Sequence, residues 1–111
     1  VTQAPMNADN FARLCRADKD AMVAAFFDPD AETAVGTLIG SLNLDDARLA
    51  TLRQILDGAL TDAMYNLLVA LDGGASIGDV QQSYDLRDES GATITGDGDL
   101  ESAAFVAFHE S

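Results

Sequence analysis

The sequence predicts a single α+β domain that is mostly helical, with four to five helices and one β-hairpin before a C-terminal helix. Three observations lead to this prediction. The chain has 111 residues, of which 48% are hydrophobic, enough for one packed core. Apolar residues recur at helical spacing over most of the first 72 positions, and they alternate with polar residues after position 80. Residues 8–111 are read as the domain, and residues 1–7 as a disordered or foreign N-terminus.

The first helix is predicted over residues 9–27. Apolar side chains recur there at intervals of three and four residues, as at Phe11 and Leu14. The pair Asp28-Pro29 ends this helix, because proline disfavours the helical conformation in the residue before it. The same pair can begin a second helix, since aspartate suits the N-cap and proline suits the first helical position.

The second helix is predicted to extend to Leu42. Gly36 and Gly40 form a pair of small residues four positions apart on it. Such pairs allow two helix backbones to approach closely. We therefore expect this helix to pack tightly on a neighbouring helix.

The third helical segment runs from residue 44 to residue 72. As one helix it would be about 43 Å long, which exceeds a compact domain of this size. Gly58 lies near its middle, so we predict a kink or a break near Asp57–Thr61. Gly73 follows the last apolar position and is a suitable stop, because glycine accepts the left-handed conformation.

A β-hairpin is predicted between residues 80 and 95. Residues 80–87 alternate in polarity, Gly91 suits the positive φ of a turn, and residues 92–95 resume the alternation. A lone hairpin is marginally stable in water, so it must pack on the helices or pair with another edge. A short helix over 100–109 is predicted to follow.

The predicted core combines the apolar faces of all these elements. Its members are Phe11, Leu14, Met22, Phe26, Val35, Leu38, Leu52, Ile55, Leu56, Leu60, Met64, Leu67, Leu68, Leu71, Tyr84, Ile94, Leu100, Ala104 and Phe108.

The net charge excludes several classes of function. Six Lys and Arg residues stand against 19 Asp and Glu residues, which gives a net charge of −13. Nucleic acids and anionic membranes are bound by clustered cationic side chains, so we expect neither as a partner. No stretch approaches the ~18 consecutive apolar residues that span a bilayer. The single cysteine suits a reducing compartment, and we expect a cytoplasmic protein.

Candidate catalytic and metal-binding sets are sparse. A hydrolytic triad would depend entirely on His109, the only imidazole in the chain. One histidine and one cysteine do not make a zinc site, and no acidic run has the ligand spacing of an EF-hand. A solvated turn is the favoured interpretation of residues 97–101, with an irregular calcium site as the alternative. Cys15 has apolar neighbours and is expected to be a small buried hydrophobe. We therefore expect no enzyme activity, no metal and no cofactor.

A distinctive pattern occupies the second half of the chain. It consists of Leu67–Gly78, Gln81-Gln82-x-Tyr84, Asp88-Glu89-x-Gly91, Gly98-x-Leu100-Glu101 and Phe108-His109. Over roughly residues 52–109 this pattern resembles a group of small bacterial proteins that have no established activity. The resemblance implies a bacterial source and a small accessory or immunity-type protein, and it carries no catalytic residue across.

Two functions fit these observations. The first is a non-enzymatic protein-binding module, inhibitor-like or immunity-like, whose acidic face binds a basic protein. The residues predicted to bind that partner are Asp85, Asp88, Glu89, Asp97, Asp99 and Glu101. The alternative is a self-associating structural or accessory domain, such as a homodimer, whose acidity reflects only solubility or genome composition.

Overall fold

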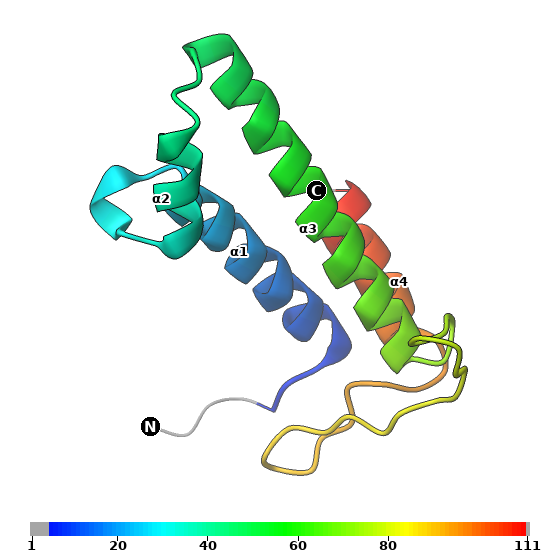
Figure 1. Ribbon diagram of the computed structural model, residues 1–111. Coiled ribbons are helices and arrows are strands. Elements are labelled where there is room, and N and C mark those ends of the chain that lie inside the picture. Colours follow the sequence, from blue (N-terminus) through cyan, green and yellow to red (C-terminus); the bar gives the residue numbers. More distant parts are fainter. Residues whose placement is uncertain (1–4, 111) are drawn as a thin grey trace.

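The computed structural model describes residues 5–110, and three of its helices pack into one layered bundle (Figure 1). Helix α1 contacts both α3 and α4, α3 and α4 contact each other, and the short α2 contacts α1. The elements are α1 (Ala8–Phe26), the 3₁₀ turn η1 (Pro29–Ala31), α2 (Ala34–Ser41), α3 (Asp46–Leu71), α4 (Asp99–Phe105) and the π-helical turn η2 (Val106–Glu110).

The expected α+β fold with a β-hairpin before the C-terminal helix is wrong. No strand occurs within residues 5–110. The segment between α3 and α4 is a long loop, with isolated bridges between Ile77 and Val80 and between Arg87 and Thr93. The turn of the expected hairpin does form, because the Gly91 amide donates to the Asp88 carbonyl at 3.0 Å and Gly91 has a φ of 91°.

Two backbone hydrogen bonds extend beyond that turn, from the Asp88 amide to the Ala92 carbonyl at 2.9 Å and from the Ile94 amide to the Leu86 carbonyl at 2.8 Å, and side-chain bonds hold the segment farther from the turn. The Leu86 amide donates to Thr95 Oγ1 at 3.0 Å, and the Thr95 hydroxyl donates to the Tyr84 carbonyl at 2.6 Å. A threonine side chain that bonds backbone groups offers them an alternative to strand pairing. The loop is thus held by specific contacts, although it forms no sheet.

Side chains cap the starts of α1, α2 and α3. Asn7 caps α1, since its side chain accepts a hydrogen bond from the Asn10 amide at 2.8 Å. The structure describes Met6 and Asn7 in contact with the fold, and the part of the N-terminal prediction that concerns residues 1–4 lies outside the described residues. After η1, Glu32 adopts a left-handed φ of 53°, which ends that turn. Thr33 then caps α2, so the helix begins later than predicted.

Helix α3 runs unbroken over its 26 residues, so the break predicted near Asp57–Thr61 does not occur. The prediction assumed a compact domain, but the molecule extends 47 Å along its longest axis, which accommodates a helix of about 39 Å. The radius of gyration is 16.6 Å, whereas about 13 Å is typical for this length. Gly58 is tolerated inside the helix at a cost of about 1 kcal/mol.

The core lies where α1, α3 and α4 meet. The buried cluster consists of Ala12, Leu68, Ile94, Leu100, Ala103, Ala104, Ala107 and Phe108. Small alanines contribute half of it, since they let the helix backbones approach closely. The predictions for Leu68, Ile94, Leu100, Ala104 and Phe108 are confirmed.

Six residues of the predicted core are exposed instead. They are Leu14, Met22, Val35, Leu38, Ile55 and Leu67. Val35, Leu38 and Ile55 lie on α2 and the first half of α3, which project beyond the packed region (Figure 1). Leu67 lies at the packed end of α3, next to buried Leu68. The apolar face of each helix was identified correctly, but this chain does not cover all of it.

Candidate protein-binding surface

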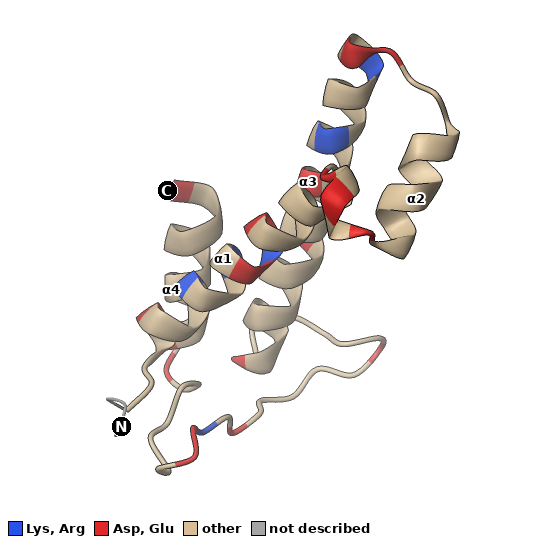
Figure 2. Cartoon of the chain, turned by 90° about the vertical axis from the view of Figure 1, so that its left-hand side faces the viewer, with Lys and Arg blue, Asp and Glu red and all other residues tan. Residues whose placement is uncertain are grey.

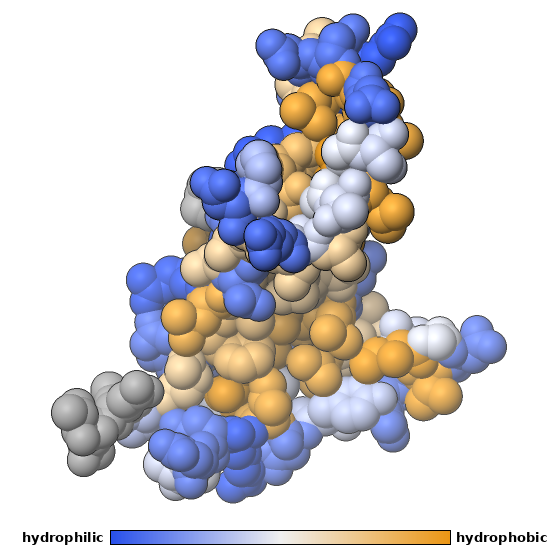
Figure 3. All heavy atoms as spheres, turned by 60° about the vertical axis from the view of Figure 1, so that its left-hand side comes forward, coloured by the Kyte–Doolittle hydropathy of each residue, from blue (hydrophilic) through white to orange (hydrophobic). Residues whose placement is uncertain are grey.

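An exposed apolar stripe follows one face of α2. It consists of Val35, Leu38 and Leu42, which are exposed by 37%, 68% and 58%. Their spacing of three and four residues places them on the same side of the helix. We call these three residues the α2 stripe. Apolar surface gathers below the hydrophilic tip at which α2 leads into α3 (Figure 3).

The α2 stripe lies in a segment without charge. Residues 33–44 contain no Asp, Glu, Lys or Arg, although 23% of the chain is charged. The nearest acidic residues along the chain are Glu32 before the segment and Asp45 after it. An uncharged apolar face with polar residues at its ends has the composition of an interface core with a polar rim.

A close backbone contact positions α2. A Cβ added at Gly36 would lie 2.9 Å from the Phe26 carbonyl oxygen and 2.7 Å from Thr33 Oγ1. Only glycine therefore fits where the first turn of α2 meets the end of α1. Gly40 has no such neighbour within 4 Å, so only the first glycine of the expected pair makes a close approach.

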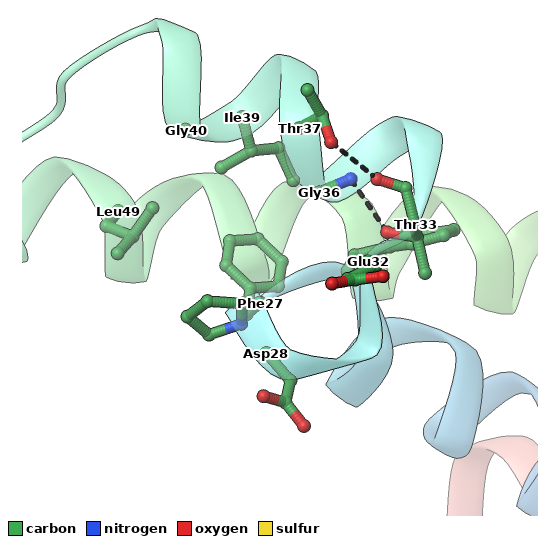
Figure 4. A pocket seen from close by; sticks show the side chains of 11 residues that line it. Phe27, Asp28, Glu32, Thr33, Gly36, Thr37, Ile39, Gly40 and Leu49 are labelled. Atoms are coloured by element: carbon green, nitrogen blue, oxygen red, sulfur yellow. Dashed lines mark hydrogen bonds between the residues drawn. The ribbon is translucent and has the colours of Figure 1, made fainter.

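A cavity of about 330 Å³ separates α2 from the start of α3. Its apolar lining includes Phe26, Phe27, Pro29, Ile39 and Leu49 (Figure 4). The cavity lies beside η1, so α2 is held mainly through its contact with the end of α1. The α2 end of the molecule is thus less tightly packed than the α1–α3–α4 core.

The total surface is large for a chain of this mass. The accessible area is 7359 Å², whereas a folded monomer of 11.6 kDa typically exposes about 5,800 Å². An elongated molecule with a long loop exposes more surface than a compact one of the same mass. Further exposed apolar side chains are Leu14, Met22, Ile55, Leu67, Ile77, Val80, Phe105 and Val106.

The acidic side chains do not gather on one face. They occur on the helices and at both ends of the molecule (Figure 2). The structure brings Asp97, Asp99 and Glu101 together at the start of α4. It places Asp85, Asp88 and Glu89 farther back in the loop between α3 and α4, where Asp85 forms an ion pair with Arg87 at 3.0 Å. The six predicted residues therefore fall into two groups.

Asp88 is committed to hydrogen bonds within the protein. Its carboxylate accepts from the Met6 amide at 2.7 Å, from the Ser90 amide and hydroxyl, and from the Ala92 amide at 2.8 Å. These bonds, led by that from Met6, lower the pKa of Asp88 to about 2. Asp88 thereby joins the loop to the residues that precede α1.

Asp72 performs a similar task that the sequence analysis missed. It follows α3, and its two carboxylate oxygens accept from the Gly96 amide at 2.6 Å and from the Glu101 amide at 3.1 Å. One side chain therefore joins the end of α3 to the start of α4. An aspartate directly before a glycine stop is the only signal in the sequence, and it does not reveal the partners.

The groups that could support catalysis are dispersed or occupied. No cluster of three His, Cys, Asp or Glu residues suited to a metal ion occurs within residues 5–110. The His109 ring packs against Tyr65, with centroids 4.6 Å apart, and against Phe105. Burial, together with the charge of Asp18, raises the pKa of the Cys15 thiol. Both effects reduce the thiolate fraction on which cysteine reactivity depends.

Ser76 lies in a Gly-x-Ser-x-Gly segment that the sequence analysis overlooked. In hydrolases that use this motif, the serine sits on a sharp turn between a strand and a helix. Here the segment Gly74–Gly78 follows helix α3 and enters the long loop, and Ser76 is exposed. The segment therefore lacks the geometry of a nucleophile turn.

None of the helices in the described part of the chain is long and apolar enough to cross a membrane. A scan against protein-family models found no match to the chain, and searches of curated proteins and of solved structures found none either.

Proposed function

We propose that this protein is a non-enzymatic protein-binding module that docks another polypeptide on its exposed apolar side chains. The observation that carries the proposal is the set of six residues of the predicted core that remain exposed on α1, α2 and α3. Two of the six, Val35 and Leu38, lie on one face of α2 beside Leu42, and exposed apolar patches mark interaction sites.

Site-specific photo-crosslinking in the source cells tests this proposal. A photoreactive phenylalanine derivative is placed at Leu14, Leu38 or Ile55, which lie on three different helices and are exposed. We expect a covalent adduct with a polypeptide from at least one of these positions. Asn66 is the matched control, because it is an exposed polar residue on α3.

The pattern of adducts decides whether the apolar surface binds a polypeptide. Adducts at one or more apolar positions but not at Asn66 support docking on the apolar surface. The proposal is overturned if no apolar position yields an adduct, or if Asn66 yields the same adducts. The mass of the adduct also distinguishes a second copy of this chain from a different protein.

A second candidate function is the binding of a basic protein by the acidic segment. One observation favours it: residues 79–101 contain seven Asp and Glu residues and a single cation, Arg87, which is paired with Asp85. Asp97, Asp99 and Glu101 lie together at the start of α4. Clustered carboxylates steer a basic partner electrostatically, at a rate that falls with salt.

Salt dependence tests this second function. A basic partner should be retained on the immobilised protein at about 50 mM salt and released at about 500 mM salt. It should also be lost from a variant with both Asp97→Asn and Asp99→Asn. A partner retained at both salt concentrations, or by that variant, would exclude electrostatic docking at this segment.

A further inference from the structure

We infer that the cavity between η1, α2 and the start of α3 is a binding site for a small organic ammonium ion with an apolar body. This site is separate from the docking surface of the proposed function, because none of the three residues of the α2 stripe lines the cavity. Three observations on the described residues support it: the size and apolar lining of the cavity, the carboxylates beside it and the absence of a cation from its lining.

The cavity has the size and the lining of a small-molecule site. Its volume is about 330 Å³, and ligand sites in proteins measure roughly 300–1,000 Å³. An engineered apolar cavity of about 150 Å³ already binds benzene. The Ile39 side chain extends from α2 toward the Phe27 ring, and Leu49 of α3 also lines the space (Figure 4). The cavity therefore has room for a six-membered ring with a short chain.

Two carboxylates contribute to the lining of this cavity. Asp28 and Glu32 flank η1 and both belong to the lining. One oxygen of Asp28 accepts from the Asp30 amide at 2.9 Å, whereas the Glu32 carboxylate has no hydrogen-bond or ion-pair partner among the described residues. In Figure 4 the Glu32 carboxylate lies between the Phe27 ring and Thr33. A carboxylate beside an apolar cavity complements a ligand that has an apolar body and a cationic end.

No cation of the described chain neutralises these carboxylates. The lining contains no Lys and no Arg. The guanidinium of Arg53 lies 5.6 Å from the centroid of the Phe27 ring, but Arg53 is not part of the lining and forms no ion pair with Asp28 or Glu32 within residues 5–110. An anionic ligand would be repelled here. An alkylammonium, which is charged at pH 7 as lysine is, supplies the missing positive charge.

An NMR titration of the full chain with three probes tests the class of ligand. The probes are 2-phenylethylammonium, 2-phenylethanol, which has the same ring without the charge, and ethylammonium, which has the charge without the ring. At pH 7 and about 150 mM salt, we expect 2-phenylethylammonium to bind saturably with a Kd of about 1 mM or below. The amide resonances of Gly36, Ile39 and Leu49 should shift, because these residues line the cavity. Each of the other probes should bind at least about fivefold more weakly.

Four variants test the position of the site. Glu32→Gln should weaken binding of 2-phenylethylammonium about fivefold, and the matched change Glu89→Gln, at an exposed loop residue outside the lining, should not. Gly40→Leu should abolish binding, because Gly40 lines the cavity and an added Cβ meets no atom within 4 Å. Gly58→Leu is its control, since a Cβ at Gly58 is equally unhindered and Gly58 lies on α3 outside the lining.

Several outcomes would overturn the inference. They are the absence of saturable shifts with 2-phenylethylammonium, equal affinity for ethylammonium, and equal affinity for 2-phenylethanol. Equal affinity for ethylammonium would mean that the net charge of −13 alone attracts the probe. Unchanged binding in both Glu32→Gln and Gly40→Leu would overturn the cavity as the site. The photo-crosslinking result at Leu38 does not depend on this cavity, so the proposed function is decided separately.

Discussion

The ammonium of Lys19, on α1, lies 2.6 Å from a carboxylate oxygen of Asp57, on α3, and joins the two longest helices of the protein. Lys19 is only 2% exposed, whereas the Asp57 side chain is 50% exposed. A second bond of 2.7 Å runs from the same ammonium to Asp20. The cation is thus buried between the helices, while both of its counter-ions remain about half exposed to water.

Removal of the Asp57 carboxylate should therefore lower the free energy of unfolding more than removal of the Lys19 ammonium. We expect Asp57→Ala to lower the free energy of unfolding by about 1–3 kcal/mol, because it leaves a buried ammonium with a lost hydrogen bond. Lys19→Met should change it by less than about 1 kcal/mol, because an apolar side chain of similar length fills the same space. Urea denaturation followed by circular dichroism measures both values. A larger loss in Lys19→Met than in Asp57→Ala would contradict this account.

The same cluster predicts a loss of stability at alkaline pH. Burial lowers the pKa of Lys19, but its hydrogen bonds to Asp20 and Asp57 and their charges raise it more, so that it lies above the ordinary value of 10.5. A raised pKa in the folded state contributes stability below 10.5 that is lost as pH rises through the folded value. The free energy of unfolding of the wild type should thus fall above about pH 10.5.

Lys19→Met provides the control for this pH profile. It keeps every other side chain of the wild type but lacks the buried ammonium. We expect a smaller decline of stability in this variant above pH 10.5. Parallel profiles for the two proteins would show that the buried ammonium makes no contribution there.

The limits of the sequence predictions have a common physical cause. The end of α1 before Asp28-Pro29 and the glycine after α3 were predictable because each signal acts within a few residues. The backbone pairing of the expected hairpin stops after the bond from the Ile94 amide to the Leu86 carbonyl. The Thr95 side chain bonds the backbone of residues 84 and 86 in its place, which local alternation does not reveal. Local pattern cannot show which distant segment, if any, lies opposite.

Local pattern also could not reveal which residues form the candidate binding surface. Periodicity identified Leu38 and Ile55 as members of apolar faces, but it could not show that this chain leaves them uncovered. The burial of Lys19 was equally invisible, because its partner Asp57 lies 38 residues away in the sequence. Exposure of apolar faces and burial of a charge are both set by tertiary contacts.

The contact between α2 and α1 predicts a difference between two glycines. Gly36→Ala would place a Cβ 2.9 Å from the Phe26 carbonyl oxygen, so α2 must shift, and we expect a loss of about 1–3 kcal/mol in stability. Gly58→Ala in α3 meets nothing within 4 Å and should stabilise the protein by about 1 kcal/mol. Thermal melts of both variants test this. Equal shifts of Tm would show that α2 does not press on α1 at Gly36.

Asp88 predicts a local transition in acid. Its pKa is lowered to about 2, from an ordinary value of 3.8, by the hydrogen bonds that its carboxylate accepts, first of all the one from the Met6 amide. A lowered pKa in the folded state contributes stability above 3.8 that is lost as pH falls through the folded value. The amide resonances of Met6 and Ala92 should therefore titrate with a midpoint near 2 in an NMR experiment. A midpoint near 3.8 would mean that these hydrogen bonds do not persist in solution.

Substitution of Asp88 should change hydrogen exchange in the loop and leave it unchanged in the helices. Asp88→Ala removes the acceptor of the Met6, Ser90 and Ala92 amides, so we expect faster hydrogen exchange at these three positions. Exchange in the middle of α1 and α3 should not change, because neither helix bonds Asp88. Glu89→Gln is the matched control, since it changes the charge of an exposed neighbour. Protection lost equally in both variants would attribute the order of this segment to charge, and protection lost only in Asp88→Ala would attribute it to the hydrogen bonds that join the loop to the start of α1.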